Sequence, residues 1–331
     1  MALIDSFGRR IDYLRISITD HCNLKCGYCM PVFSGRPHLN HVEILTYEEL
    51  YRLAEAAVCA GISKIRITGG EPLVRKGMVE FCNMLGSLPG LNSLALSTNG
   101  VQMAKMADSL KAAGVNRVNV SLDTLQRKRF EKITGCDKLE DVLAGIQEAD
   151  AVGFHPVKIN VVVIRGVNDD EIAQLAALTY QHEWHVRFIE LMPFQQALFG
   201  DYQDLYMPIG AIIKRIPHIK EAHVGPGLAT NGPARMCTLP GANGKIGFIA
   251  PMSWHFCGSC NRLRLTADGK IRTCLFAETE IDVKTPLRAG ASKRELVELF
   301  YDAAQAKPRR HHLSRVLRPN PRQRAMHAIG G

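Results

Sequence analysis

The sequence predicts an α/β fold, an incomplete (β/α)6 TIM-like barrel, from three observations. Strand-like runs alternate with helix-like segments through the first two thirds of the 331 residues, and such alternation is typical of a parallel sheet flanked by helices. The repeat occurs six times. The G-x-G-x-x-G turn of dinucleotide-binding folds does not occur in the sequence. A doubly wound sheet is the alternative that this pattern leaves open.

The predicted elements divide the chain into two parts. Strands are predicted over residues 13–19, 64–68, 93–98, 117–122, 157–164 and 185–190, and helices over 46–59, 76–85, 102–113, 138–152 and 169–181. Gly61, Gly86, Gly114 and Gly153 closely follow four of these helices, as C-terminal glycines often do. After about residue 205 the repeat fades, and 225–232 reads as a loop or linker. We therefore expect a partial barrel over residues 1–217 and, over residues 218–331, a C-terminal extension that closes its open side.

Charged residues occupy alternate positions in the predicted strands, whereas buried parallel strands are usually apolar throughout. Because successive side chains point to opposite faces and helices cover the outer face, the polar set is expected to point inward. This set contains five cations: Arg15, Lys64, Arg66, Lys158 and Arg187. Some can pair with acids such as Glu71, Asp123 or Glu190, but five inward cations together favour a polyanion such as a di- or triphosphate.

Composition excludes several classes of protein. Hydrophobic residues make up 46% and charged residues 22% of the chain, as in ordinary globular proteins. No apolar run approaches the length of a membrane span, and the N-terminus lacks the apolar segment of a signal peptide. Ten cysteines without an export signal favour metal ligation over disulfides, so we expect a cytoplasmic protein.

The net charge of +9 is concentrated near the C-terminus. Residues 307–324 contain seven Lys or Arg and no acid, which leaves the rest of the chain near +2. Such a segment is most often a solvated tail, and contact with a phosphate or a partner is the alternative. It has no aromatic residue for base stacking, so the charge alone does not indicate nucleic-acid binding.

Three cysteines, Cys22, Cys26 and Cys29, follow the first predicted strand at a C-x3-C-x2-C spacing. Thiolates ligate zinc, copper(I) and iron–sulfur clusters, and most such sites need four ligands. His21 is adjacent to Cys22 and poorly placed to share its metal. A [4Fe–4S] cluster held by three cysteines instead leaves one iron open to a small molecule.

The second predicted strand ends in Thr68-Gly69-Gly70-Glu71-Pro72, at the edge where barrel enzymes carry their sites. The glycines allow a ligand to approach the backbone closely, and Glu71 can accept a hydrogen bond from an ammonium group. A plain turn before a helix-starting proline is the alternative. Opposite the cysteine loop, the segment is expected to form a ledge that binds an amino-acid-shaped ligand.

A second set of three cysteines, Cys257, Cys260 and Cys274, has the spacing C-x2-C-x13-C. A structural zinc ribbon that recruits Cys237 as fourth ligand is the alternative to a second incomplete cluster. The other cysteines, Cys59, Cys82 and Cys136, are expected to be ordinary core residues.

These motifs resemble the radical S-adenosylmethionine superfamily and, within it, the GTP 3′,8-cyclases of molybdenum cofactor biosynthesis. CNLKCGYC and TGGEP carry the broader resemblance; SITDHCN, KIRITGGEP, NVSLD, RFIELM, CGSCNRLRL and the final IGG carry the narrower one. The resemblance implies a lyase with two [4Fe–4S] clusters, one chelating S-adenosylmethionine and the other taking the guanine of GTP. It also implies that a 5′-deoxyadenosyl radical abstracts H3′ and that the C3′ radical attacks guanine C8.

The resemblance further implies roles for single residues. Cys22, Cys26 and Cys29 match the ligands of the first cluster, and Cys257, Cys260 and Cys274 match those of the second. Contacts to S-adenosylmethionine are implied for Tyr28, Gly70, Ser121 and Met192. Contacts to GTP are implied for Arg15, Arg66, Ser97, Lys158, Arg262, Leu263 and Arg264, of which Arg15, Arg262 and Arg264 match catalytic residues. Lys64 and Asn160 are weaker matches, and Ser97 stands where relatives usually carry Thr.

The implied partners are GTP, a low-potential electron donor and the next pathway enzyme, cyclic pyranopterin monophosphate synthase, which would receive the product. We expect a monomer or homodimer that binds neither membrane nor nucleic acid. The short Gly330-Gly331 end is expected to thread into a crowded cavity, with a frayed terminus as the alternative. Two other functions stay open: a radical peptide-modifying enzyme with an auxiliary iron–sulfur cluster, and a nucleic-acid-binding protein with a zinc ribbon.

Overall fold

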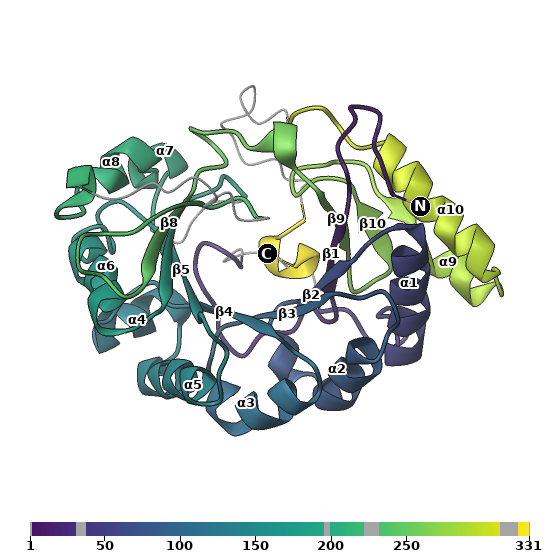
Figure 1. Ribbon diagram of the computed structural model, residues 1–331, viewed down its shortest axis with the longest axis horizontal. Helices are drawn as coiled ribbons and strands as arrows, with labels where there is room; N and C mark the ends of the chain where they lie inside the picture. Colours follow the sequence, from purple (N-terminus) through teal and green to yellow (C-terminus); the bar gives the residue numbers. More distant parts are fainter. Residues whose placement is uncertain (1, 31–37, 195–198, 222–231, 312–323, 331) are drawn as a thin grey trace.

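The computed structural model describes residues 2–30, 38–194, 199–221, 232–311 and 324–330. Its strands form an arc around a central space, with helices on the outside (Figure 1). The C-terminal turn η5 (Met326–Ile329) lies inside the arc.

Six parallel strands form the centre of the sheet in the order of the sequence. They are β1 (Tyr13–Ser17), β2 (Lys64–Thr68), β3 (Ser93–Thr98), β4 (Arg117–Ser121), β5 (Lys158–Val163) and β6 (His185–Glu190). Each lies within two residues of its predicted bounds. The parallel α/β class is confirmed. The sequential order differs from a doubly wound sheet, whose strand order reverses at a switch point.

Helices α1 (Tyr47–Ala60), α2 (Met78–Gly86), α3 (Met103–Ala112), α5 (Leu139–Ala151) and α6 (Ile172–Gln181) correspond to the five predicted ones. Helix α1 follows a capping box formed by Thr46 and Glu49, and Gly61, whose φ is 117°, caps its C-terminal end. Gly86 is the last residue of α2 rather than its cap. The sequence prediction missed α4 (Arg127–Thr134), in which Phe130, Ile133 and Thr134 are the only buried residues.

The C-terminal extension adds strands to both edges of the arc. At one edge, β8 (Lys245–Ile249) pairs parallel with β6 and antiparallel with β7 (Arg235–Cys237). At the other, β9 (Arg262–Leu265) pairs parallel with β1 and is followed by β10 (Lys270–Arg272) and β11 (Ile281–Asp282). The sheet therefore has β7 and β11 as its edge strands, and in the described part of the chain no strand pairing joins them.

Two short helices, α7 (Tyr202–Leu205) and α8 (Ile209–Ile213), follow β6, and the extension contains α9 (Lys284–Arg288) and α10 (Lys293–Gln305). Helix α10 packs beside α1 on the outer surface of the molecule (Figure 1). Among the described residues we find no helix with the length and apolarity needed to cross a membrane.

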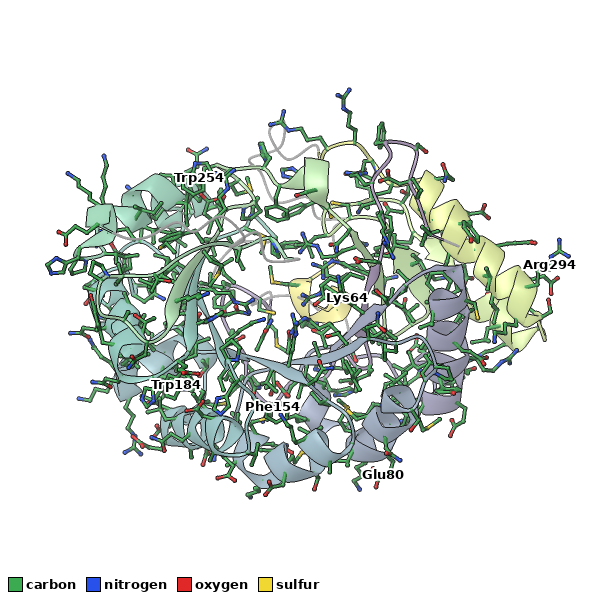
Figure 2. All side chains as sticks on the ribbon, in the orientation of Figure 1. Lys64, Glu80, Phe154, Trp184, Trp254 and Arg294 are labelled. Atoms are coloured by element: carbon green, nitrogen blue, oxygen red, sulfur yellow. The ribbon has the colours of Figure 1, made fainter. Side chains whose placement is uncertain are left out.

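Alternate residues of the central strands serve two different surfaces, as the sequence pattern predicts. Ile16, Ile65 and Val118 are fully buried in the core under the helices. Their neighbours face the central space, and Figure 2 shows Lys64 there, with Glu80 and Arg294 at the periphery. The backbone alternation of a strand therefore separates a hydrophobic core from a charged interior.

The basic segment 307–324 is not a solvated tail where the structure describes it. Lys307 is buried, and its Nζ donates to the carbonyl oxygens of Arg262 and Thr273 at 2.8 and 2.6 Å. Arg324 forms ion pairs with Asp268 and Glu280 at 2.9 and 2.6 Å. Residues 312–323 lie outside the described residues. The predicted solvation is wrong for Lys307 and Arg324, because their partners come from distant parts of the sequence.

Candidate active site

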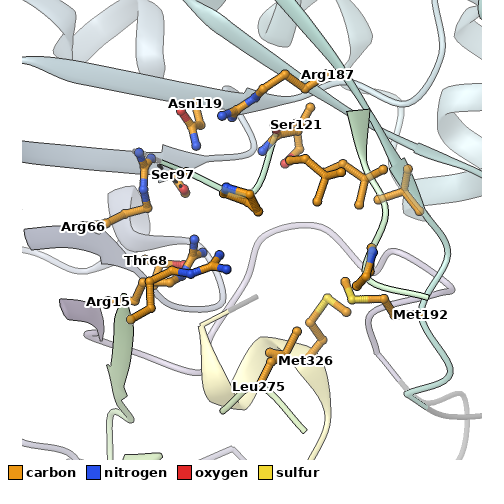
Figure 3. A pocket seen from close by; sticks show the side chains of 18 of the residues that line it. Arg15, Arg66, Thr68, Ser97, Asn119, Ser121, Arg187, Met192, Leu275 and Met326 are labelled. Atoms are coloured by element: carbon orange, nitrogen blue, oxygen red, sulfur yellow. Dashed lines mark hydrogen bonds between the residues drawn. The ribbon is translucent and has the colours of Figure 1, made fainter. Parts of the chain in front are cut away.

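A cavity of about 380 Å³ occupies the centre of the arc, and side chains of all six central strands line it. Figure 3 shows Arg15, Arg66 and Arg187 pointing into it from different strands. Every residue predicted for the site lines this cavity except Leu263. Leu263 lies between two inward arginines on β9, so its side chain faces the other way and is fully buried in the core.

Three arginines stand side by side on one wall of the cavity. Arg15 of β1 is in register with Arg66 of β2 and with Arg264 of β9. Burial lowers the pKa of Arg15 to about 10; nearby Tyr13 raises this pKa and nearby Arg66 lowers it further, both by smaller amounts. Burial and the neighbouring cations also hold the pKa of Arg264 well below its usual value. Adjacent buried cations are costly without negative charge, so this wall is suited to a polyanion.

A second cationic patch is formed by Lys158 of β5 and Arg187 of β6. Burial, reinforced by Arg187, lowers the pKa of Lys158 to about 7, and burial with nearby Arg66 lowers that of Arg187 to about 9. Gly247 on β8 makes room here, because an added Cβ would lie 2.9 Å from Arg187 Cγ.

Several buried polar atoms of this patch have no hydrogen-bond partner in the described structure: Arg187 Nε, Asn119 Oδ1 and Asn160 Oδ1. Buried polar atoms are rarely left unsatisfied in folded proteins. These atoms therefore indicate where polar groups of a ligand would bind.

The first cysteine triad lies beside two buried acids. Burial, partly offset by the Leu24 N–H, raises the pKa of the Cys22 thiol to about 11, and burial with nearby Cys22 raises that of Cys29 to about 12. Burial also raises the pKa of Asp123 to about 6, and its Oδ2 accepts a hydrogen bond from Tyr28 Oη at 2.7 Å. Such thiols ionise only with a metal, and the nearby carboxylates favour a cationic ligand.

The Gly-Gly-Glu-Pro turn joins the loops that follow β1, β2 and β3. Gly70 N donates to Thr19 O at 2.7 Å, and an added Cβ on Gly70 would lie 2.2 Å from His21 O. Glu71 accepts hydrogen bonds from Leu73 N, Thr98 Oγ1 and Asn99 N at 3.0, 2.8 and 2.6 Å. The glycines thus allow close approach of the chain's own backbone, and Glu71 fixes the loop after β3.

The acids that were candidate partners for the inward cations bind loop groups instead. Glu71 and Asp123 do so as described above, and Glu190 accepts from Ile209 N and Met252 N at 2.8 and 2.9 Å. Lys64 pairs with Asp12 at 2.9 Å. Among the described residues, Arg66, Lys158 and Arg187 form no ion pair with those three acids, and all three side chains line the cavity.

The second cysteine triad lies beside cations rather than acids. Burial opposes ionisation of the Cys260 thiol, but Arg262 and Lys307 outweigh it and lower its pKa to about 6. Arg262 stacks on Phe256, with 5.0 Å between its guanidinium carbon and the ring centre. Arg9 donates to the carbonyl oxygen of Cys257 at 2.7 Å. A thiolate is thus stabilised at Cys260 by the chain itself.

The spacing of the sulfurs favours clusters over single ions. Among the described residues, which include all ten cysteines, no three cysteine sulfurs lie within 4.8 Å of one another. Tetrahedral zinc with Zn–S bonds of about 2.3 Å needs sulfurs about 3.8 Å apart. Cys237, the fourth ligand of the zinc alternative, is buried on β7 and does not line the cavity. The donor sets therefore fit the wider [4Fe–4S] group better than zinc.

The C-terminal end of the described chain enters the cavity wall. Gly330 O accepts hydrogen bonds from Arg264 Nη1 at 2.6 Å and from Arg15 Nη2 at 3.3 Å. Gly330 has φ of 69°, and an added Cβ would lie 2.7 Å from Thr68 Cγ2. The predicted insertion into a crowded cavity is confirmed for Gly330, and Gly331 lies outside the described residues.

Sequence reasoning missed three residues that shape the site. Tyr13 Oη accepts a hydrogen bond from Arg66 Nε and lines the cavity. Its position two residues before Arg15 gives it the same inward direction, a signal that the alternation contained. Asp123 was treated only as a possible ion-pair partner, and Lys307 was assigned to the tail. Neither had a local sequence signal for its role.

Comparison with protein families divides the chain in two. Residues 16–179 match the model of the radical SAM superfamily, and residues 184–313 match that of Molybdenum Cofactor Synthesis C.

Known relatives match over nearly the whole length. A protein of Heliobacterium modesticaldum named GTP 3′,8-cyclase is 50% identical over 315 residues, covering 94% of this chain and 95% of the relative. One of Moorella thermoacetica with the same name is 50% identical over 327 residues and covers 99% of both chains.

Solved structures support the fold. The crystal structure of Streptococcus suis SuiB bound to S-adenosylmethionine superposes with a TM-score of 0.64 at 15% identity, covering 89% of this chain and 67% of SuiB. At that identity the likeness concerns the fold alone.

Proposed function

The chain belongs to the GTP 3′,8-cyclase family of radical S-adenosylmethionine enzymes, and we propose that it converts GTP to (8S)-3′,8-cyclo-7,8-dihydroguanosine 5′-triphosphate. This is the first step of molybdenum cofactor biosynthesis. One observation carries the proposal: two incomplete cysteine triads face a single cavity whose walls carry inward cations. A site of this form can hold a radical source and a nucleoside triphosphate together.

Family membership implies S-adenosylmethionine and one [4Fe–4S] cluster. We assign that cluster to Cys22, Cys26 and Cys29, whose three thiols leave one iron position for the methionyl end of the cofactor. When bound, the cluster and cofactor supply a 5′-deoxyadenosyl radical through one-electron reduction of the sulfonium.

The chain's own residues bind and orient the cofactor. Tyr28, Gly70, Ser121 and Met192 line the same cavity as the first triad. Buried Asp123 and Glu71 lie close enough to raise the pKa of thiols in the triad. Their carboxylates favour the positively charged sulfonium and ammonium groups over neutral or anionic ligands.

GTP is assigned to the cationic part of the cavity. Arg15, Arg66 and Lys158 neutralise the triphosphate, and Ser97, which accepts from Arg66 Nη1 at 3.2 Å, keeps that guanidinium in place. Arg262 and Arg264, beside the second triad, orient the nucleoside, so that Arg15, Arg262 and Arg264 act as positioning groups around the reacting ribose. Leu263 is not assigned a contact to GTP, because it does not line the cavity and its side chain lies in the core.

The second triad is proposed to hold another [4Fe–4S] cluster with an open iron for the guanine. Cys257, Cys260 and Cys274 fit this role because their sulfurs are too widely spaced for one ion and cations lie beside Cys260. We also propose that the partial barrel ends at residue 217 and the C-terminal extension begins at residue 218. The proposed partners are a low-potential electron donor and cyclic pyranopterin monophosphate synthase, which would receive the product.

Anaerobic incubation of the reconstituted chain with S-adenosylmethionine, reductant and each nucleoside triphosphate tests the proposed reaction. We expect 5′-deoxyadenosine and a cyclised product with GTP, and no cyclised product with ATP, CTP or UTP. The reconstituted chain should contain about eight iron atoms. Four iron atoms with one zinc, or equal cyclisation of every triphosphate, would contradict the two-cluster model.

A radical peptide-modifying enzyme is the alternative that the sequence left open. The same incubation separates the two. A peptide enzyme would form 5′-deoxyadenosine without a GTP product.

A further inference from the structure

A cluster of metal-ligating side chains lies outside the cavity, on the loop that carries the first cysteine triad. Asp20, His21 and His38 place one ligand atom each within 4.8 Å of one another. The rings of His21 and His38 stack with centroids 4.3 Å apart. His21 Nε2 lies 3.9 Å from Asp20 Oδ1, and His38 Nδ1 lies 3.4 Å from Asp20 Oδ2. The two imidazoles therefore converge on the two oxygens of one carboxylate.

The carboxylate of Asp20 has an unused oxygen. The Asp20 side chain is only 6% exposed. Its Oδ2 accepts a hydrogen bond from Leu39 N at 2.8 Å, whereas its Oδ1 has no hydrogen-bond partner in the described structure. A buried, unsatisfied anionic oxygen is costly, and a cation is the ligand that it favours.

The histidines can adjust while the carboxylate cannot. The side chains of His21 and His38 are 54% and 48% exposed. The backbone of His21 is fixed, because its carbonyl oxygen accepts from Glu71 N at 2.8 Å. Rotation of the half-exposed rings changes the positions of their nitrogens, and bonds of about 2.1 Å to one ion require ligand atoms about 3.4 Å apart.

We propose that Asp20, His21 and His38 form a third metal site, which binds a divalent transition metal such as zinc or iron(II). Two imidazoles and one carboxylate are a donor set typical of these ions, and the remaining coordination positions stay open to water. The site is separate from both cysteine triads. Its ligands do not line the cavity.

The metal would connect two parts of the chain, next to a third. Asp20 and His21 directly precede Cys22 of the first triad, and His38 belongs to the segment that enters helix α1. His327 of the C-terminal turn lies edge-on to His38, with ring centroids 6.2 Å apart. The bound ion fixes the segment at residues 38–40 against the loop of the first triad.

Zinc binding by the fully reconstituted protein tests the proposal. The iron-loaded chain is dialysed anaerobically against increasing zinc, and zinc and iron per chain are measured by mass spectrometry. We expect one saturable zinc per chain with no loss of iron. In His38→Gln and in the double variant His21→Gln/His38→Gln, zinc affinity should fall at least about 10-fold, since even outer-shell changes cost about 10–100-fold.

The control is His41→Gln, which removes an exposed histidine from the same segment but outside the cluster. It should bind zinc as the unchanged chain does. No saturable zinc, zinc that displaces iron, or zinc retained by the double variant would overturn the proposal. The iron content and GTP turnover of the same samples report on the proposed function separately, so failure of one proposal is distinguishable from failure of the other.

Discussion

The two cysteine triads face the same cavity but have opposite electrostatic surroundings. The first is buried beside Glu71 and Asp123, and the pKa values of Cys22 and Cys29 are raised to about 11 and 12. The second lies beside Arg262 and Lys307, and the pKa of Cys260 is lowered to about 6. Both sites offer three cysteines, but the residues around the first triad are negatively charged and those around the second are positively charged.

The difference predicts which molecule each triad faces. Carboxylates beside the first favour a sulfonium and an ammonium group, and guanidinium groups near the second favour a nucleotide. The row Arg264, Arg15 and Arg66 extends the positive field across the wall between them. The charge distribution therefore distinguishes a negative end and a positive end of the cavity, which the cysteine spacing alone does not.

The largest expected effect comes from removing one triad at a time. Cys26→Ser should abolish both 5′-deoxyadenosine and cyclised GTP, because the radical source is lost. Cys274→Ser should retain 5′-deoxyadenosine but lose cyclisation, because only the nucleotide site is damaged. Each variant should lose about four iron atoms. Chromatography of the products and iron analysis measure these outcomes.

Cys59 is exposed on α1, so its prediction as a core residue was wrong. Cys59→Ser is therefore the matched control and should behave as the unchanged chain does. If Cys274→Ser cyclised GTP normally, the assignment of nucleotide binding to the second triad would be wrong.

Removing the arginines of the second site should have the next largest effect. Arg264→Ala deletes a guanidinium that faces the cavity and also holds Gly330 O at 2.6 Å. Arg262→Ala deletes the cation beside Cys260. Loss of charge-assisted hydrogen bonds worth about 1.5–3 kcal/mol each should lower kcat/KM for GTP by about 10–100-fold or more. Kinetic assays under saturating S-adenosylmethionine measure this loss.

The iron content of the first cluster should not change in either variant. Arg294→Ala, on the outer surface with its side chain 90% exposed, is the control and should leave kcat/KM unchanged. Full activity of both cavity variants would reject their proposed role.

Protonation of Lys158 gives a smaller, pH-dependent effect. Burial and nearby Arg187 lower its pKa to about 7, so at pH 8 it is mostly neutral in the free chain. A bound triphosphate favours the charged form, and GTP binding at pH 8 should therefore take up as much as about 0.9 proton. Affinity for GTP should fall as the pH rises above 7.

Calorimetry in two buffers of different ionisation enthalpy measures this proton uptake. Lys158→Met should remove it, and the exposed control Lys105→Met should retain it. Uptake that persists in Lys158→Met would mean that another group titrates.

The sequence predicted the central strands well because their signal is local. An inward cation at every second residue requires only the alternation of a strand, so Arg15 and Arg66 were placed correctly from their own neighbours. The same signal was too short in the extension, where β10 has three residues and β11 has two. The apolar periodicity of a helix was not recognisable in α4, because its eight residues are mostly charged.

The remaining misses depend on contacts between distant residues. Lys307 has the sequence context of a solvated tail, and its burial depends on carbonyl groups of Arg262 and Thr273. Glu71 was predicted to accept a hydrogen bond from a ligand's ammonium group, but Thr98 and Asn99, at the end of β3, donate to its oxygens. Composition cannot reveal which long-range partner satisfies a polar group.

The smallest expected effect separates the ring of Tyr28 from its hydroxyl group. Tyr28→Phe removes only the hydrogen bond from Oη to Asp123 Oδ2, while Val162 N still donates to Asp123 Oδ1 at 2.8 Å. Affinity for S-adenosylmethionine should therefore fall by less than about 10-fold, the size of one hydrogen bond of about 1 kcal/mol. Tyr28→Ala also removes the aromatic surface and should cost about 10-fold more. Equilibrium dialysis with labelled cofactor measures both. Because Tyr28 belongs to the negative end of the cavity, neither variant should alter the Kd for GTP, and a weaker GTP complex without a change in cofactor binding would reverse the assignment of the two ends.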